Sequence, residues 1–192
     1  KIILLTDSLK ACSLSIGGKS TIKQVVVEDL DGDGENEIFA LIGRRDCKTS
    51  EGFSLIRCVG ESLVESKSWS RAEYGPWKLA AADTDGDGTQ ELALAVITRS
   101  RRTGVQENQL NIFDFVDGNL YPKWFCARDF VDFEFAVLGD EQRLITAERI
   151  SRGCYALVSY RWEGFGYVRD RILCVTSDPL IKEVLPCARQ ED

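Results

Sequence analysis

One acidic segment of nine residues occurs twice in this chain, at residues 29–37 and again at residues 83–91. Each copy has acidic side chains at its first, third, fifth and ninth positions and glycine at its fourth and sixth. Carboxylates at alternate positions of a tight turn converge on one point, and glycine permits the positive φ angles of such a turn. Two like charges about 4 Å apart repel by roughly 4 kcal/mol at an effective dielectric constant of 20, so the pattern calls for a cation. Ca²⁺ takes six to eight oxygen ligands in flexible geometry, and we predict one calcium site in each segment.

The residues around the two segments predict strands rather than helices. An EF-hand loop needs a bidentate Glu at its twelfth position and a helix on each side. Position twelve is Ala40 in the first copy and Leu94 in the second. Short apolar runs precede and follow both segments, which is typical of strands. The sequence therefore predicts two strand–loop–strand units and excludes an EF-hand.

The spacing of the two segments predicts a repeat. The second segment begins 54 residues after the first, so a third copy is expected near residue 137. Apolar residues 133–138 and 143–147 stand there on either side of a tight turn at residues 139–142. The acidic ligands are missing from this turn, and we expect a third strand–turn–strand unit without a metal site.

Four strands can be placed within one period. In the second repeat they are residues 77–82, 92–98, 109–116 and 121–128, with a turn signal at Asp117-Gly118-Asn119 before the last. A repeat of about 50 residues with four antiparallel strands is typical of a propeller blade. We therefore predict one all-β domain over residues 1–192, a β-propeller of four-stranded antiparallel blades. Its three full repeats are expected at about 24–75, 76–131 and 132–175.

The two ends of the chain, residues 1–23 and 176–192, are predicted to form a partial or shared fourth blade. Ile2–Thr6 and Ala11–Ile16 have the patterns of third and fourth strands, and Leu180–Leu185 has that of one more strand. A shared blade would remove the exposed sheet edges that invite aggregation. The alternative is that the chain is a segment of a larger propeller, whose ring another chain completes.

The doubled loop resembles the calcium loops of FG-GAP (VCBS-type) repeats, which build the propellers of integrin α-chains and of secreted bacterial proteins. The family's Phe-Gly before the loop and Gly-Ala-Pro after it are absent, and Leu41-Ile42-Gly43 stands in the latter place. The resemblance implies a calcium-binding β-propeller with two Ca²⁺ sites. The implied ligands are Asp29, Asp31, Asp33, Glu37 and the carbonyl of Glu35, and Asp83, Asp85, Asp87, Glu91 and the carbonyl of Thr89. The alternative is a pair of solvated acidic turns.

Composition excludes several classes of function. The chain contains no histidine, which excludes Ser-His-Asp triads, Cys-His nucleophiles and most zinc sites. Its formal net charge of -7 argues against general nucleic-acid binding. Seven cysteines without Cys-x-x-Cys spacing predict an oxidising, extracellular or cell-surface location, and Cys47 and Cys58 are the pair expected to form a disulfide. No apolar run reaches the ~18–20 residues of a transmembrane segment.

Arginine recurs in the hairpin after the second strand of each repeat, which antiparallel pairing places opposite the acidic loops. The residues are Arg44, Arg45, Arg99, Arg101, Arg102, Arg149 and Arg152. Arginine suits bidentate recognition of carboxylate, sulfate or phosphate, so this face is a candidate site for an anionic partner. Solubility of charged hairpin tips is the alternative. The aromatic residues Trp69, Tyr74, Trp77, Tyr121, Trp124 and Trp162 are expected to pack within and between blades rather than form a sugar-binding platform.

These observations favour a non-catalytic, calcium-stabilised binding or adhesion module for a protein or glycan partner, outside the cytosol. The sequence offers no catalytic set, because the clustered carboxylates are assigned to the metal. A propeller-fold polysaccharide lyase or glycosidase, using paired carboxylates, is the alternative among enzymes. An intracellular propeller scaffold is the alternative among binding proteins.

Overall fold

The computed structural model describes residues 2–5, 11–14, 20–59, 62–70, 75–99, 104–128 and 130–181. Fourteen strands lie in these ranges: β1 (Ile2–Leu5), β2 (Ala11–Leu14), β3 (Ser20–Glu28), β4 (Glu37–Arg44), β5 (Gly52–Val59), β6 (Ser62–Trp69), β7 (Gly75–Ala82), β8 (Glu91–Arg99), β9 (Gln106–Val116), β10 (Asn119–Arg128), β11 (Phe130–Leu138), β12 (Glu141–Ser151), β13 (Cys154–Trp162) and β14 (Tyr167–Thr176). The described residues include no apolar helix of membrane-spanning length. The all-β prediction is confirmed.

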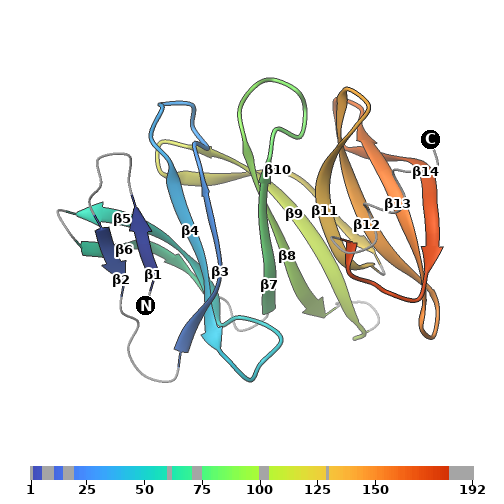
Figure 1. Ribbon diagram of the computed structural model, residues 1–192, viewed down its shortest axis with the longest axis horizontal. Helices are drawn as coiled ribbons and strands as arrows, with labels where there is room; N and C mark the ends of the chain where they lie inside the picture. Colours follow the sequence, from blue (N-terminus) through green and yellow to red (C-terminus); the bar gives the residue numbers. More distant parts are fainter. Residues whose placement is uncertain are drawn as a thin grey trace.

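The strands form three sheets that follow the predicted repeats. Four consecutive strands pair antiparallel in each: β3–β6 in the first sheet, β7–β10 in the second and β11–β14 in the third. The hairpin of β1 and β2 extends the first sheet, where β2 lies parallel to β6. Figure 1 shows the three sheets side by side in chain order, with β1 towards one end of the row and β14 towards the other.

The predicted terminal strands are only partly described. Ile2–Thr6 and Ala11–Ile16 correspond to β1 and β2, which lie beside β6. Of Leu180–Leu185, the residues after Ile181 lie outside the described part of the chain. The shared fourth blade therefore stays a prediction.

Turn chemistry explains the hairpins within the repeats. Asp117 and Gly118 connect β9 to β10 with φ angles of 51° and 73°, and two positive φ angles in a two-residue connection define a type I′ turn. Gly139, with φ of 65°, begins the two-residue connection between β11 and β12, and a positive φ at the first residue alone is typical of a type II′ turn. The third repeat thus has the short hairpin that the sequence predicts in place of an acidic loop.

The predicted disulfide between Cys47 and Cys58 is wrong. Cys47 is a free, exposed thiol in the turn that precedes β5, and Cys58 lies near the far end of that strand. Strand residues advance about 3.3 Å each, so the six steps from Gly52 to Cys58 span about 20 Å. A disulfide requires Cα atoms within ~7 Å of each other. The two cysteines are close in sequence, but most of strand β5 lies between them and separates them in space.

Buried side chains join each sheet to the next. The alternation along β8 shows this most clearly, because both faces of the strand are buried. Its Leu92 and Leu94 belong to an apolar cluster with Phe39 and Phe115, between the first and second sheets. Its Ala93 belongs to a cluster between the second and third sheets. Small residues on one face and large ones on the other set how closely each neighbouring sheet can approach.

Trp69, Trp77, Trp124 and Trp162 pack against the apolar clusters between the sheets, as the sequence predicts, but the Tyr121 side chain is exposed and Tyr74 lies outside the described residues. Trp69 stacks on Phe53 with ring centroids 4.9 Å apart, and Trp124 meets Tyr167 edge-on at 5.4 Å. Such pairs add to the stability that area burial provides. Trp69 and Trp124 are therefore structural residues of the sheet interfaces.

The first strands of the three sheets are joined by contacts that recur with the sequence period. The side chains that make them are Gln24, Lys78 and Asp132, each 54 residues after the last and each directly after a break in strand register. The Gln24 amide accepts from Leu79 N–H at 2.9 Å and donates to the Leu79 carbonyl at 2.6 Å. Lys78 donates to the Phe133 carbonyl at 2.5 Å, and Asp132 accepts from Ile181 N–H at 3.2 Å. We call these three contacts the inter-sheet clasps.

The second clasp includes a partly buried ion cluster. Lys78 Nζ lies 2.7 Å from Asp132 Oδ1 and 2.8 Å from Glu134 Oε1. Its side chain is 15% exposed, and those of the two carboxylates are 11% and 16% exposed. The positive charge of Lys78 on β7 thus offsets the negative charges of Asp132 and Glu134 on β11.

Candidate functional site

The two acidic segments form the β3–β4 and β7–β8 connections, which both lie along the upper edge of the row of sheets in Figure 1. Both glycines of each loop have the expected positive φ: Gly32 has 74° and Gly34 has 86°, and Gly86 and Gly88 have 80° and 94°. A side chain at any of these four positions would be strained by the backbone angle. The glycines therefore give both loops the same curvature.

A hydrogen-bond network holds the first loop. Both oxygens of Asp29 accept main-chain N–H groups, from Gly32 at 2.8 Å and from Gly34 at 2.9 Å. Glu37, at the start of β4, reaches back to accept the N–H of Leu30 at 3.0 Å. The loop is thereby closed on itself at its first and last acidic positions.

The second loop repeats this network. Asp83 accepts from Gly86 N–H at 2.7 Å and from Gly88 N–H at 3.0 Å. Glu91 accepts from Thr84 N–H at 2.7 Å and also from the Thr84 hydroxyl at 2.5 Å. The two loops share one backbone design and differ in what surrounds it.

Three carboxylates of the first loop are brought together. One oxygen each from Asp29, Asp31 and Asp33 lies within 4.8 Å of the others. Among the described residues, no lysine or arginine forms an ion pair with this loop. Partial burial raises the pKa of the Glu37 carboxyl, and the charges of the three aspartates act in the same direction. The first loop therefore concentrates negative charge that no lysine or arginine of the described residues balances by an ion pair.

The second loop has a partner that the sequence analysis missed. Its grouped oxygens belong to Asp83, Asp85 and Glu91, and Glu91 is only 1% exposed. Lys123, from β10, places its ammonium 2.7 Å from Asp85 and 2.7 Å from Glu91. It also lies 3.1 Å from Asp114 on β9. Burial by itself lowers the pKa of Lys123, but the hydrogen bonds to the three carboxylates outweigh burial and raise it.

The side of the second loop towards the third sheet is also polar. Within the described part of the chain, the buried Tyr167 hydroxyl on β14 has no hydrogen-bond partner of standard geometry. Burial raises the pKa of the Tyr167 phenol, and the negative charge of Glu91 adds to this effect. The second residue of this loop, Thr84, is buried and polar, whereas Leu30 at the same position of the first loop is fully buried in the apolar cluster between the first two sheets. The two loops thus sit in an apolar and a polar interface, respectively.

Not every predicted ligand falls into these groups. Glu37 lies outside the first group and Asp87 outside the second, although both belong to the same loops. Glu35 and Thr89 donate their main-chain N–H groups to Asp33 and Asp87, each at 2.7 Å. Metal ligation by their carbonyls stays a prediction.

The arginine hairpins lie at the opposite ends of the strands from the acidic loops. Arg44, Arg45, Arg99, Arg149 and Arg152 are exposed, and Arg101 and Arg102 lie outside the described residues. Arg44 pairs with Asp46 at 2.8 Å. An exposed pair of this kind contributes little to stability, so these side chains remain available to a partner.

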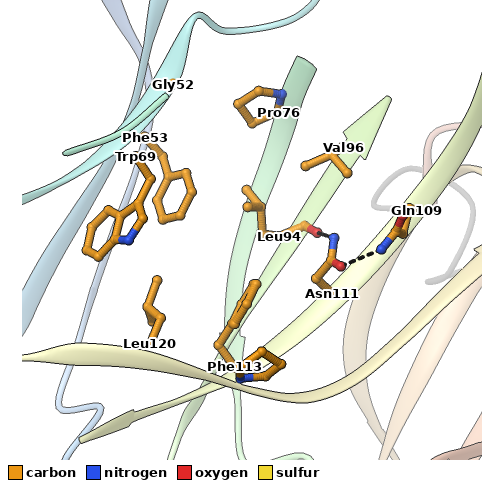
Figure 2. A pocket seen from close by; sticks show the side chains of 11 residues that line it. Gly52, Phe53, Trp69, Pro76, Leu94, Val96, Gln109, Asn111, Phe113 and Leu120 are labelled. Carbon is orange, nitrogen blue, oxygen red and sulfur yellow. Dashed lines mark hydrogen bonds between the residues drawn. The ribbon is translucent and has the colours of Figure 1, made fainter. Parts of the chain in front are cut away.

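A cavity of about 370 Å³ lies between the first and second sheets (Figure 2). Its walls are mostly apolar and include Phe53, Trp69 and Phe113. Two amides face it: Gln109 donates to Asn111 Oδ1 at 2.7 Å, and Asn111 donates to the Leu94 carbonyl at 3.4 Å. One face of the Trp69 ring is covered by Phe53, and the Lys67 ammonium lies 5.3 Å from the ring centroid. Phe53 and Lys67 thus already interact with the Trp69 ring.

Comparison with known proteins identifies no relative. No protein-family model, curated protein or solved structure matches the chain. The functional argument therefore depends on the geometry of the loops and of the sheets.

Proposed function

We propose that this chain is a calcium-stabilised, non-catalytic binding module built on β-propeller repeats. The observation that carries the proposal is the first loop, where three aspartate oxygens lie within 4.8 Å of one another. No lysine or arginine of the described residues pairs with them. Calcium would supply the missing positive charge and fix the connection between β3 and β4.

The donor set of the first loop fits a hard cation. Asp29, Asp31 and Asp33 offer carboxylate oxygens, the ligand type that Ca²⁺ and Mg²⁺ prefer. A loop with several carboxylates favours Ca²⁺, whose coordination geometry is flexible, because Mg²⁺ demands near-ideal octahedral geometry. Glu37 and the carbonyl of Glu35 are the remaining proposed ligands. The role of the ion is structural, since it would remove the repulsion among charges that the fold holds together.

The propeller arrangement is supported by the inter-sheet clasps. Gln24 links the first strand of one sheet to that of the next, and Lys78 repeats the link one period later. Successive blades of a propeller pack in this way around an axis, with each first strand next to the following one. Asp132 extends the pattern to Ile181 and so towards a fourth unit. With β1 and β14 towards opposite ends of the row, these contacts favour a segment of a larger ring, completed by another chain, over a small closed ring.

The cysteines also bear on where the protein is located. Cys47 and Cys154 are free thiols among the described residues. Disulfides persist in oxidising compartments, and free thiols are usual in reducing ones. This observation favours the intracellular scaffold as the second candidate, beside the extracellular module that the cysteine count predicts.

Binding of an acidic partner is expected at the arginine hairpins. Replacing Arg99, Arg101 and Arg102 together by Ser should weaken binding by at least fivefold and flatten its dependence on salt, because exposed charges are screened by ions. The probe is an array of sulfated and carboxylated glycans and acidic peptides, read in excess calcium and in excess chelator. Arg57→Ser, on the exposed face of β5, is the matched control. Equal binding by the triple variant and the parent would assign the hairpin charges to solubility.

A further inference from the structure

The second loop already contains a cation, the ammonium of Lys123. It lies within 2.7 Å of two carboxylates, Asp85 and Glu91, that belong to the group of oxygens a metal would use. A third carboxylate, Asp114, lies 3.1 Å away. The Lys123 side chain is 15% exposed and Glu91 is 1% exposed, so this charge pairing is largely shielded from water.

Lys123 lies at a break in strand register that the first and second repeats share. The β5–β6 hairpin closes with Val59 opposite Ser62, and the β9–β10 hairpin closes with Val116 opposite Asn119. Counted from these closing pairs, the strand register breaks at the same place in both hairpins. The extra residue there is Ser66 in the first repeat and Lys123 in the second. One position of the repeat therefore carries a neutral, short side chain in the first repeat and a long cation in the second.

A lysine and a calcium ion exclude each other at this site. Both would use the carboxylates of Asp85 and Glu91, and two positive charges at one place repel. A bound Ca²⁺ would have to expel the ammonium from three carboxylates at once. The donor set of the second loop therefore does not fit a metal while Lys123 is in place.

We propose that Lys123 is the resident cation of the second loop, so that the protein binds one calcium ion and not two. The single ion belongs to the first loop, and this part of the inference rests on the proposed function. The second loop then folds without metal, and its lysine is a positioning residue for Asp85 and Glu91. Removing the lysine should uncover a second calcium site.

The test is the calcium stoichiometry of the full chain, measured by isothermal titration of chelator-stripped protein with CaCl₂. We expect one ion for the parent, none for Asp31→Asn, and one for Asp85→Asn. Lys123→Ser, which introduces the side chain found at Ser66, should bind two ions. Lys67→Ser, on exposed β6, is the matched control and should bind one.

The outcomes separate this inference from the proposed function. Two ions bound by the parent, with one lost in Asp31→Asn and one in Asp85→Asn, would overturn the inference and leave the calcium module intact. No ion bound by the parent and one bound by Lys123→Ser would support the inference and overturn the calcium role of the first loop. No ion in either protein would overturn both. If Lys123→Ser does not fold, the parent, Asp31→Asn and Asp85→Asn still decide how many loops bind calcium.

Discussion

Replacing Lys78 by Met should lower the free energy of unfolding by about 3–5 kcal/mol, the usual cost of removing one partner of a buried ion pair. The variant removes the ammonium that lies 2.7 Å from Asp132 and 2.8 Å from Glu134, both of them largely buried carboxylates. It also leaves the Phe133 carbonyl without its hydrogen bond. For a chain of this length the melting temperature should fall by about 6–20 °C. Urea unfolding followed by tryptophan fluorescence measures the effect.

Lys78→Gln is the second variant of this experiment. Glutamine is the residue at the equivalent position of the first repeat, where Gln24 forms both hydrogen bonds to Leu79. It keeps a donor for the Phe133 carbonyl but not the charge, so an intermediate loss of stability is expected. Ordinary surface substitutions change the free energy of unfolding by less than about 0.5 kcal/mol. If Lys78→Met and Lys78→Gln both lose less than this, the Lys78 clasp does not hold the second and third sheets together.

Replacing Lys123 by Met should cost a similar amount, about 3–5 kcal/mol, when the protein is measured in excess chelator. Glu91 would then be buried without a counter-ion, beside Asp85. Added calcium should restore part of the loss, because the uncovered carboxylates can then bind the ion. Thermal unfolding of the variant with and without calcium measures both effects.

The control for Lys123 is Lys67→Met, since Lys67 is an exposed lysine on β6, outside both loops. The loss of stability in Lys67→Met should be small and should be the same with added calcium and in excess chelator. A Lys123 variant as stable as its parent in chelator would contradict the charge-balancing role of this side chain.

Much of the fold could be predicted because the relevant signals are local. The positive φ angles of the loop glycines follow from their positions between alternate carboxylates, and the turn at Asp117 and Gly118 follows from residue type. The period came from the two acidic loops alone, and it correctly placed the turn at Gly139 in the third repeat. Four strands per repeat then followed from apolar patterning.

What the sequence did not reveal depends on contacts between residues that differ in chemistry or lie far apart. Gln24, Lys78 and Asp132 occupy one position of the repeat, yet an amide, an ammonium and a carboxylate share no sequence signature. Lys123 approaches Asp85 from a different hairpin, at a break in register that no residue pattern marks. The 54-residue period matches Lys123 with Trp69, and only counting from the hairpin turns matches it with Ser66, so the difference in charge at this position is hidden from an alignment by period.

The central claim is that calcium stabilises the first loop, and thermal unfolding of the stripped parent protein tests it most directly. A ligand at 100 times its Kd that binds only the folded state adds about 2.7 kcal/mol, which is about 5–11 °C for a chain of this size. We expect a rise of that order on adding calcium, abolished by Asp31→Asn, which removes one of the grouped aspartates. A melting curve that is identical in excess calcium and in excess chelator would contradict the account.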